Sequence, residues 1–207
     1  RHDTLMNALY WRYKDLLPDH KELSLVNRID KFTSGVVLVS KDPEAKRDLQ
    51  RQFEARTVSK TYLAIATGEL ESESGEIDLP VGPKKNRVNR VLMGVREDDE
   101  GRPAQTSYRV LKRFDGFTLL HLAPRTGRQH QLRVHLAALG HPLAADHLYG
   151  DNRGYAWVDD HGAEGRFSRF ALHASTIRFR HPLHGHPLCV TAPPAPDFAA
   201  FVEILRH

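Results

Sequence analysis

The chain has 207 residues, of which 40% are hydrophobic and 27% charged, enough for one large domain or two small halves that share a cleft. Lysine and arginine outnumber aspartate and glutamate by 30 to 26, so the formal charge of +4 fits a polyanionic partner only if the cations cluster. The single cysteine, Cys189, excludes an internal disulfide and a thiolate metal cluster and favours the reducing cytoplasm. No apolar run is long enough to span a bilayer, so no membrane association is expected.

The first part of the chain is predicted to alternate helices with strands. The spacing of apolar residues favours a surface helix over 5–16. The run Val36–Ser40 is rich in β-branched residues and predicts a buried strand. Asp42 is then a capping residue, and the following proline and glutamate favour a helix over 43–56. A further strand is predicted over 60–66.

The second part of the chain is predicted to consist mainly of hairpins. Residues 69–104 show no clear period, so we expect irregular hairpins or functional loops there. Asp115 and Gly116 separate two β-rich runs and predict a tight hairpin. The pattern then predicts a helix over 129–139, strands over 171–179 and 187–192, and a final helix over 197–205. Because strands mostly connect through hairpins, the predicted class is α+β with a largely antiparallel mixed β-sheet and flanking helices and loops.

A carboxylate flanked by two cations lies just before the predicted strand Val36–Ser40. Asp30 stands between Arg28 and Lys31. The two cations would keep the carboxylate ionised, which is the state that a nucleophile needs. An aspartate before a strand is also commonly a turn residue that bonds its own backbone. From this pattern alone, both interpretations stay open.

The densest group of cations and amides lies at the junction of a predicted loop and helix. Arg128, Gln129, His130 and Arg133 fall together there. Free backbone N–H groups at a helix start favour an anion, and arginine and glutamine side chains hold phosphates and base edges. Gln129 and Arg133 are one turn apart and are predicted to share a helix face. Because a stripe of leucines beside Arg133 must be buried, we expect this arginine to reach inward.

Three histidines near the C-terminus invite a metal interpretation. His181, His184 and His186 are separated by proline and glycine, which predict a turn between two strands. No nearby acid or thiolate completes a closed site, so no metal is expected. Cys189 lies in the strand that follows and is interpreted as a small apolar filler.

Five ordered motifs together resemble those of the RluA-type family of pseudouridine synthases, and they cover roughly residues 5–205. They are H-R-[LI]-D-x-x-T-S-G at 27–35, K-x-Y at 60–62, T-G-R-x-H-Q-[IL]-R-V-H at 126–135, H-P-L-x-x-D-x-x-Y-G at 141–150 and L-H-A-x-x-[IL]-x-F-x-H-P at 172–182. The chain departs from the first motif at Asn27, where the family usually has histidine. Asparagine cannot become cationic, so the histidine of the family is not expected to be its essential acid or base.

The resemblance implies the pseudouridine synthase catalytic fold and an isomerase that converts specific uridines of ribosomal or transfer RNA to pseudouridine. Because this rearrangement involves no oxidation or reduction, no cofactor is expected. The implied organisation is a single catalytic domain over 1–207, a monomer whose two halves meet at a central cleft across the sheet, without an S4-like domain. Two alternatives stay open: a catalytically silent RNA-binding or ribosome-assembly module on the same fold, and, ranked lower, a metal-dependent hydrolase that uses the histidines.

The resemblance also implies catalytic roles for three residues. Asp30 would be the catalytic carboxylate, which attacks the sugar, adds to the base or removes a sugar proton. Tyr62 would stack on the flipped uracil, and its hydroxyl would relay a proton. Arg133 would pair with Asp30 and fix its direction.

Contacts with RNA are expected from several cationic and polar side chains around these three residues. Phosphate contacts would offset the cost of unstacking the target base, a few kcal/mol. Arg28 is equally consistent with a structural ion pair, and the basic run 84–90 is nearly balanced between RNA contact and a solvated surface. The residues expected to bind RNA are Arg28, Lys60, Arg128, Gln129 and His130.

Overall fold

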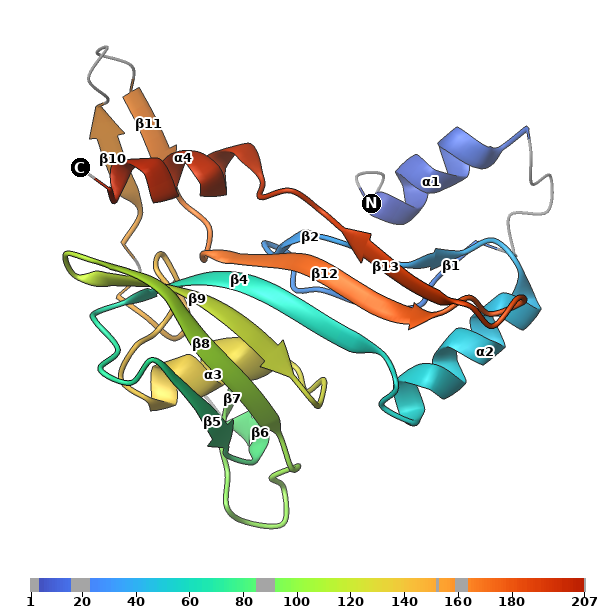
Figure 1. Cartoon of the computed structure of the whole chain (residues 1–207), viewed down its shortest axis with the longest axis horizontal. Coiled ribbons are helices and arrows are strands. Elements are labelled where there is room, and N and C mark those ends of the chain that lie inside the picture. The colour runs from blue at the N-terminus through green and yellow to red at the C-terminus, as the bar shows by residue number, and fades with distance from the viewer. Residues whose placement is uncertain (1–3, 16–22, 85–91, 152, 159–163, 207) are drawn as a thin grey trace.

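The structure, a computed structural model, describes residues 4–15, 23–84, 92–151, 153–158 and 164–206. One seven-stranded sheet runs through the molecule, with strand order β13-β12-β4-β9-β8-β5 (Figure 1). The short β2 pairs in parallel with β12, and all other neighbours in this sheet are antiparallel. The predicted α+β class with a largely antiparallel mixed sheet is therefore confirmed. Its strands are β2 Ser34–Gly35, β4 Ser59–Thr67, β5 Ser74–Asp78, β8 Gln105–Phe114, β9 Phe117–Pro124, β12 Leu172–Arg180 and β13 Pro187–Thr191.

Three two-stranded antiparallel sheets accompany the large sheet. They pair β1 Ser24–Leu25 with β3 Val39–Ser40, β6 Val81–Lys84 with β7 Leu92–Val95, and β10 Tyr155–Val158 with β11 Glu164–Phe167. The pairs β5–β8 and β6–β7 account for much of the segment predicted to form irregular hairpins. The β8–β9 hairpin turns at Asp115 and Gly116, as the sequence predicts.

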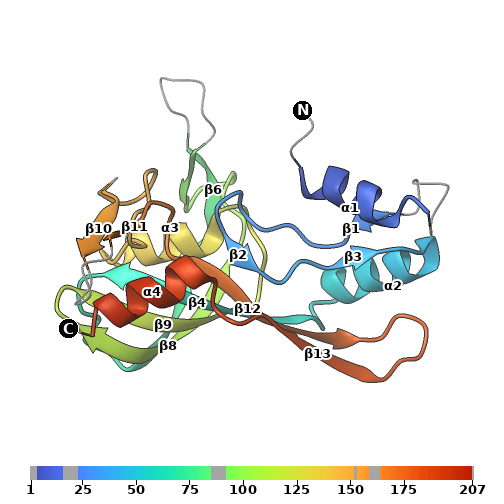
Figure 2. The ribbon, with the colours of Figure 1, turned by 90° about the horizontal axis from the view of Figure 1, so that it is seen from above.

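The helices are α1 Leu5–Tyr13, α2 Pro43–Glu54, α3 Gln131–Ala138 and α4 Pro196–Ile204. Helix α1 has no buried residue, which confirms the predicted surface helix, although residue 16 of that prediction lies outside the described residues. Helix α2 begins as predicted, because the Asp42 carboxylate accepts a hydrogen bond from the backbone N–H of Ala45 at 2.8 Å. Together with β1 and β3, α1 and α2 gather at one end of the molecule, while α4 and the β10–β11 pair lie at the other (Figure 2). No described helix has the length and apolar character needed to cross a bilayer.

Helices α3 and α4 cover opposite faces of β4. Ala64 and Ala66 pack in one core cluster with residues of α3, whereas Ile65 packs in a second cluster with Phe198 and Phe201 of α4. Successive side chains of a strand point to opposite faces, so the alternation along β4 places the two helices on the two sides of the sheet. The sheet is thereby buried on both faces near its centre and holds its polar strand ends in fixed positions.

The predicted single buried strand over Val36–Ser40 is wrong. Strand β2 ends at Gly35, β3 begins at Val39, and the residues between them are only partly buried. The chain changes partner here: Val36 N–H donates to the Ala174 carbonyl of β12, and β3 then pairs with β1. Gly35 permits the change because its φ is +111° and a Cβ at this position would lie 2.1 Å from the Ala174 oxygen.

Two further predictions need correction. The helix predicted over 129–139 begins only at Gln131, because His130 adopts a left-handed backbone with φ 54° and ψ 17°. Gln129 therefore precedes the helix and does not share a helix face with Arg133. Cys189 is exposed on the edge strand β13 and is not an apolar filler.

Candidate active site

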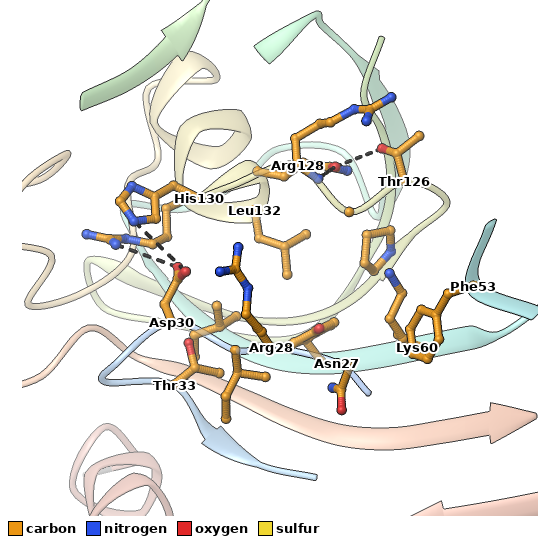
Figure 3. A pocket seen from close by; sticks show the side chains of 17 residues that line it. Asn27, Arg28, Asp30, Thr33, Phe53, Lys60, Thr126, Arg128, His130 and Leu132 are labelled. Carbon is orange, nitrogen blue, oxygen red and sulfur yellow. Dashed lines mark hydrogen bonds and ion pairs between the residues drawn. The ribbon is translucent and has the colours of Figure 1, made fainter. Parts of the chain in front are cut away.

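The cavity beside Asp30 is lined by segments that are far apart in the sequence. Its volume is about 210 Å³, and a cavity of about 150 Å³ already holds one benzene ring, so a single pyrimidine base fits. Apolar side chains of Ile29, Leu132 and Leu172 form part of its wall. Side chains from the Asn27–Thr33 loop, from β4 and from the segment before α3 converge on it (Figure 3).

Asp30 presents its carboxylate to this cavity. The turn that carries it is closed by the backbone, since Thr33 N–H donates to the Asp30 carbonyl at 2.9 Å. The Asp30 side chain is 27% exposed and faces two groups from the α3 region (Figure 3). Arg133 Nη1 lies 3.7 Å from Oδ2, and His130 Nε2 lies 3.9 Å from Oδ1. The structure thus brings together the predicted Asp30 and Arg133.

The nearest partner of Arg133 is a second carboxylate that the sequence-based interpretation did not assign. Arg133 donates through Nε and Nη2 to both oxygens of Asp146, at 2.7 and 2.8 Å. Asp146 is fully buried and balances the buried guanidinium, so Arg133 has this structural partner in addition to Asp30. Rings of Tyr149 and Phe170 lie 4.8 and 4.1 Å from the guanidinium carbon and hold it between them.

Asp146 is kept ionised by its hydrogen bonds. Burial alone would raise its pKa, but the bonds from Arg133 and from the backbone N–H groups of Leu148 and Tyr149 hold the pKa of Asp146 below its ordinary value. Arg133 is therefore paired and fixed before any substrate enters, and it offers Asp30 only its remaining nitrogen, Nη1.

Tyr62 of β4 lines the cavity next to Asp30. Burial, and secondarily the charge of Asp30, raise the pKa of Tyr62 to about 12. The hydroxyl is therefore protonated at neutral pH and can donate a hydrogen bond. The hydroxyl can accept a proton only if it gives up the proton that it already carries. This is compatible with the predicted relay and not with a phenolate base.

Two of the predicted RNA-contacting cations, Lys60 and Arg28, reach the cavity from different sides. Lys60 lies with its Nζ 6.0 Å from the centre of the Phe53 ring, and burial lowers the pKa of Lys60. Arg28 is exposed and points into the cavity (Figure 3). No described acid lies within ion-pair distance of Arg28, so the alternative of a structural ion pair finds no partner in the described residues.

The segment before α3 is held by Gln131, which the sequence-based interpretation did not single out as a site residue. Its side chain is buried, accepts bonds from Thr126 Oγ1 at 2.7 Å and Arg128 N–H at 3.0 Å, and donates to β8. Arg128 itself lines the cavity and donates to the Pro103 carbonyl at 3.1 Å. Gln129 is exposed and does not line the cavity. The basic run 84–90, apart from Lys84, lies outside the described residues.

The loop of Asp30 is tied to the sheet and to α4 by Arg169, another residue that sequence reasoning missed. Arg169 donates to Asp197 at 2.6 and 2.9 Å, to the Phe32 carbonyl at 2.9 Å and to Ser34 Oγ at 3.1 Å. His173 Nδ1 lies 2.9 Å from the same Ser34 oxygen. Since these contacts join positions up to 139 residues apart, no local sequence pattern could have predicted them.

Asn27, the one departure from the first motif, has a structural task. Its Oδ1 accepts the backbone N–H of Leu38 at 2.6 Å and so joins the chain on either side of Asp30. This role needs an acceptor and no charge. Asparagine therefore holds the loop without taking part in proton transfer.

The three C-terminal histidines stack on one another outside the cavity, with ring centres 4.6 to 6.1 Å apart. Among the described residues, no group of three or more histidine, cysteine, aspartate or glutamate side chains could hold a metal ion. The histidine cluster is therefore not part of the cavity beside Asp30.

Comparison with known proteins finds relatives of the chain in one family of RNA-modifying enzymes. The model of the RNA pseudouridylate synthase family matches residues 4–138. A ribosomal large subunit pseudouridine synthase D of Nitrosomonas europaea is 41% identical over the whole chain, and a ribosomal large subunit pseudouridine synthase C of Vibrio vulnificus is 40% identical over 92% of it. In each case the chain spans 58% of the relative's length.

Solved structures show the same fold. The chain superimposes on human RNA pseudouridylate synthase domain containing 1 with a TM-score of 0.73 and 28% identity, covering 100% of this chain and 86% of that one. Human RNA pseudouridylate synthase domain containing 4 gives a TM-score of 0.74 and 26% identity, with 98% and 83% covered. With a family model that matches most of its length and the Asp30 motif in a base-sized cavity, this chain belongs to the RluA-type RNA pseudouridylate synthase family.

Proposed function

We propose that this chain is the catalytic part of an RNA pseudouridine synthase in which Asp30 is the catalytic carboxylate. The observation that carries the proposal is the position of Asp30, the one acid among the described residues that line the cavity, opposite Arg133 and His130. Relatives are named for the large ribosomal subunit, so the substrate that we propose is a uridine of ribosomal RNA, with transfer RNA as the alternative.

The reaction needs nothing beyond the substrate and acid–base groups. The bond between the sugar C1′ and uracil N1 breaks, the base turns, and a bond between C1′ and C5 forms. The proton lost from C5 balances the proton gained at N1. In this proposal Asp30 attacks the sugar, adds to the base or removes a sugar proton, and Tyr62, whose raised pKa keeps it protonated, relays a proton.

Substrate entry requires a base outside its helical stack, because the cavity holds one ring and the catalytic groups lie within it. Removing a base from its stack costs a few kcal/mol. Arg28, Lys60 and Arg128 line the cavity and would supply positive charge for the adjoining phosphates. We further propose that the protein acts as a monomer in the cytoplasm, where its exposed thiol stays reduced; light scattering of the purified protein tests the monomer.

The test is Asp30→Asn, which removes the charge and keeps the shape. We expect this variant to bind transcripts of ribosomal RNA as the wild type does and to form no pseudouridine when the products are mapped by sequencing. Asp115→Asn is the matched control, since it makes the same change at an exposed hairpin turn. Residual conversion by Asp30→Asn would refute the role of Asp30, and a wild type that binds RNA without converting any uridine would favour the silent module.

A further inference from the structure

His130 and Tyr149 form a hydrogen-bonded pair beside Asp30. His130 Nδ1 lies 2.7 Å from the Tyr149 hydroxyl, and the two rings meet edge to face with centres 5.6 Å apart. The other ring nitrogen, Nε2, faces Asp30 Oδ1 at 3.9 Å. The side chain of His130 is 16% exposed, so its ring is turned toward these two residues and away from solvent.

The direction of the bond between the two rings follows from the second partner of the hydroxyl. Met93 N–H on β7 donates to the Tyr149 oxygen at 3.0 Å and occupies one of its lone pairs. The hydroxyl has a single proton, and in the described part of the chain the acceptor within reach of it is His130 Nδ1. When Nδ1 accepts, the proton of a neutral imidazole sits on Nε2. The proton on Nε2 points toward the negative oxygen of Asp30. In the opposite tautomer, a lone pair on Nε2 would face that oxygen and repel it.

The backbone of His130 shows that this orientation is held against strain. Its φ of 54° lies in the left-handed region, which a non-glycine residue adopts only at an energetic cost. The residue stands directly before α3 and makes no side-chain cap to that helix. In this conformation the ring does not cap the helix but contacts Tyr149 and faces Asp30.

Burial is the main effect that opposes the protonation of His130 and lowers its pKa. Burial lowers its pKa, as do the nearby Arg133 and His147, whereas Asp30 and Asp146 raise it, and the net pKa is below the ordinary value. Burial likewise raises the pKa of Tyr149, so the phenol keeps its proton at neutral pH. The pair is therefore a neutral phenol bonded to a neutral imidazole.

We propose that Tyr149 is a positioning residue that holds His130 as the neutral tautomer with its proton on Nε2, so that Asp30 Oδ1 faces an uncharged donor. This inference rests on the proposed function, because it gives the pair a purpose in the chemistry of Asp30. An uncharged donor orients the carboxylate without binding it tightly. A protonated His130 would form a second ion pair with Asp30 and draw its oxygen away from the substrate.

The test combines the state of the ring with the pH dependence of the reaction. Tyr149→Phe removes the hydroxyl but keeps the ring against Arg133 and His130. Tyr108→Phe, on β8 outside the cavity, is the matched control. Long-range ¹H–¹⁵N spectra of the full chain report the tautomer and titration of His130, whose signals are assigned by their loss in His130→Gln. Single-turnover rates on the transcript that the wild type modifies are measured from pH 6 to 8.

We expect the wild-type His130 to carry its proton on Nε2 at pH 7.5. In Tyr149→Phe the neutral ring loses its hydrogen bond, so the pKa of His130 should rise and the rate at pH 6 should fall by roughly three- to tenfold relative to that at pH 8. Tyr108→Phe should match the wild type in both measurements.

Three results would overturn the proposal: a wild-type ring protonated on Nδ1, a titration of His130 that is unchanged in Tyr149→Phe, or a changed titration with an unchanged pH profile. If Tyr149→Phe does not fold, the tautomer of His130 in the wild type still tests the proposal. A wild type without activity refutes the proposed function, which the spectra distinguish from a failure of the tautomer assignment.

Discussion

Replacing Asp146 by asparagine tests which carboxylate is the structural partner of Arg133. The substitution keeps the size of the side chain but replaces one carboxylate oxygen by an NH₂ group. This group cannot accept a hydrogen bond, so one of the two bonds that Arg133 donates to Asp146 is lost. Asp146 is 0% exposed and Arg133 is 3% exposed, so water cannot replace the lost bond. Asp30, at 3.7 Å and 27% exposed, cannot take over without moving its loop.

The expected loss of stability is large. Removing one partner of a buried ion pair costs about 3–5 kcal/mol, compared with a total stability of about 5–15 kcal/mol for a typical domain. With a urea dependence of about 2 kcal/mol per molar, the unfolding midpoint of Asp146→Asn should fall by about 2 M at pH 7. Asp30→Asn should change the free energy of unfolding by less than about 1 kcal/mol, because its pair with Arg133 is longer and partly solvated.

The pH dependence provides an independent check. The folded pKa of Asp146 is lowered from its ordinary value of 3.8. Its charge therefore stabilises the fold at pH values above 3.8, and this contribution is lost as the pH falls through the lower folded value. The difference in the free energy of unfolding between the wild type and Asp146→Asn should therefore be largest at pH 7 and smaller at pH 3. Urea unfolding followed by circular dichroism at both values measures it, and Asp115→Asn shows the effect of the same change at the surface. An Asp146→Asn midpoint no lower than that of Asp30→Asn would refute the pairing described here.

Two other substitutions probe the site and its support. Tyr62→Phe should retain RNA binding, because stacking needs only the ring, while the single-turnover rate falls by about 10²-fold if the hydroxyl relays a proton; an unchanged rate would remove the hydroxyl from the mechanism. Gly35→Ala should lower the free energy of unfolding by at least about 1–3 kcal/mol, because φ is +111° and the new Cβ would meet the Ala174 oxygen at 2.1 Å. Urea unfolding measures this loss, and a midpoint equal to that of the wild type would contradict the claim that only glycine fits where β2 joins β12.

Local chemistry in the sequence predicted the elements whose ends are determined locally. Asp42 caps α2 through its own side chain, and Asp115 with Gly116 closes the β8–β9 hairpin, so both could be recognised from neighbouring residues. The strand predicted at Val36–Ser40 failed because its β-branched residues suit a strand, while the chain there exchanges one distant partner for another. The strand propensity of a residue does not say which strand the chain will pair with, so it cannot predict such a change of partner.

The candidate site shows the same division. The motifs located Asp30, Tyr62 and Arg133, and the fold brings them to one cavity, since each lies beside it on a well-defined loop, strand or helix. Residue types could not reveal that Asp146 neutralises the buried charge of Arg133, although the motif at 141–150 contains this acid. The left-handed backbone at His130 was also missed, because the residue type at a helix start does not reveal its dihedral angles.

Two carboxylates share one buried guanidinium, and their different surroundings give them different roles. Oδ1 of Asp146 accepts from Arg133 Nη2 and from the N–H groups of Leu148 and Tyr149, and Oδ2 accepts from Arg133 Nε, so both oxygens of this buried side chain are hydrogen-bonded. Among the described residues, the ion-pair partners of the Asp30 oxygens lie at 3.7 and 3.9 Å, beyond hydrogen-bond length, and the side chain lines the cavity. A group that attacks a sugar or a base, or removes a proton, must reach the substrate, and of these two carboxylates Asp30 is the one that lines the cavity. Because Asp146 already balances Arg133, the guanidinium can direct Asp30 without capturing it.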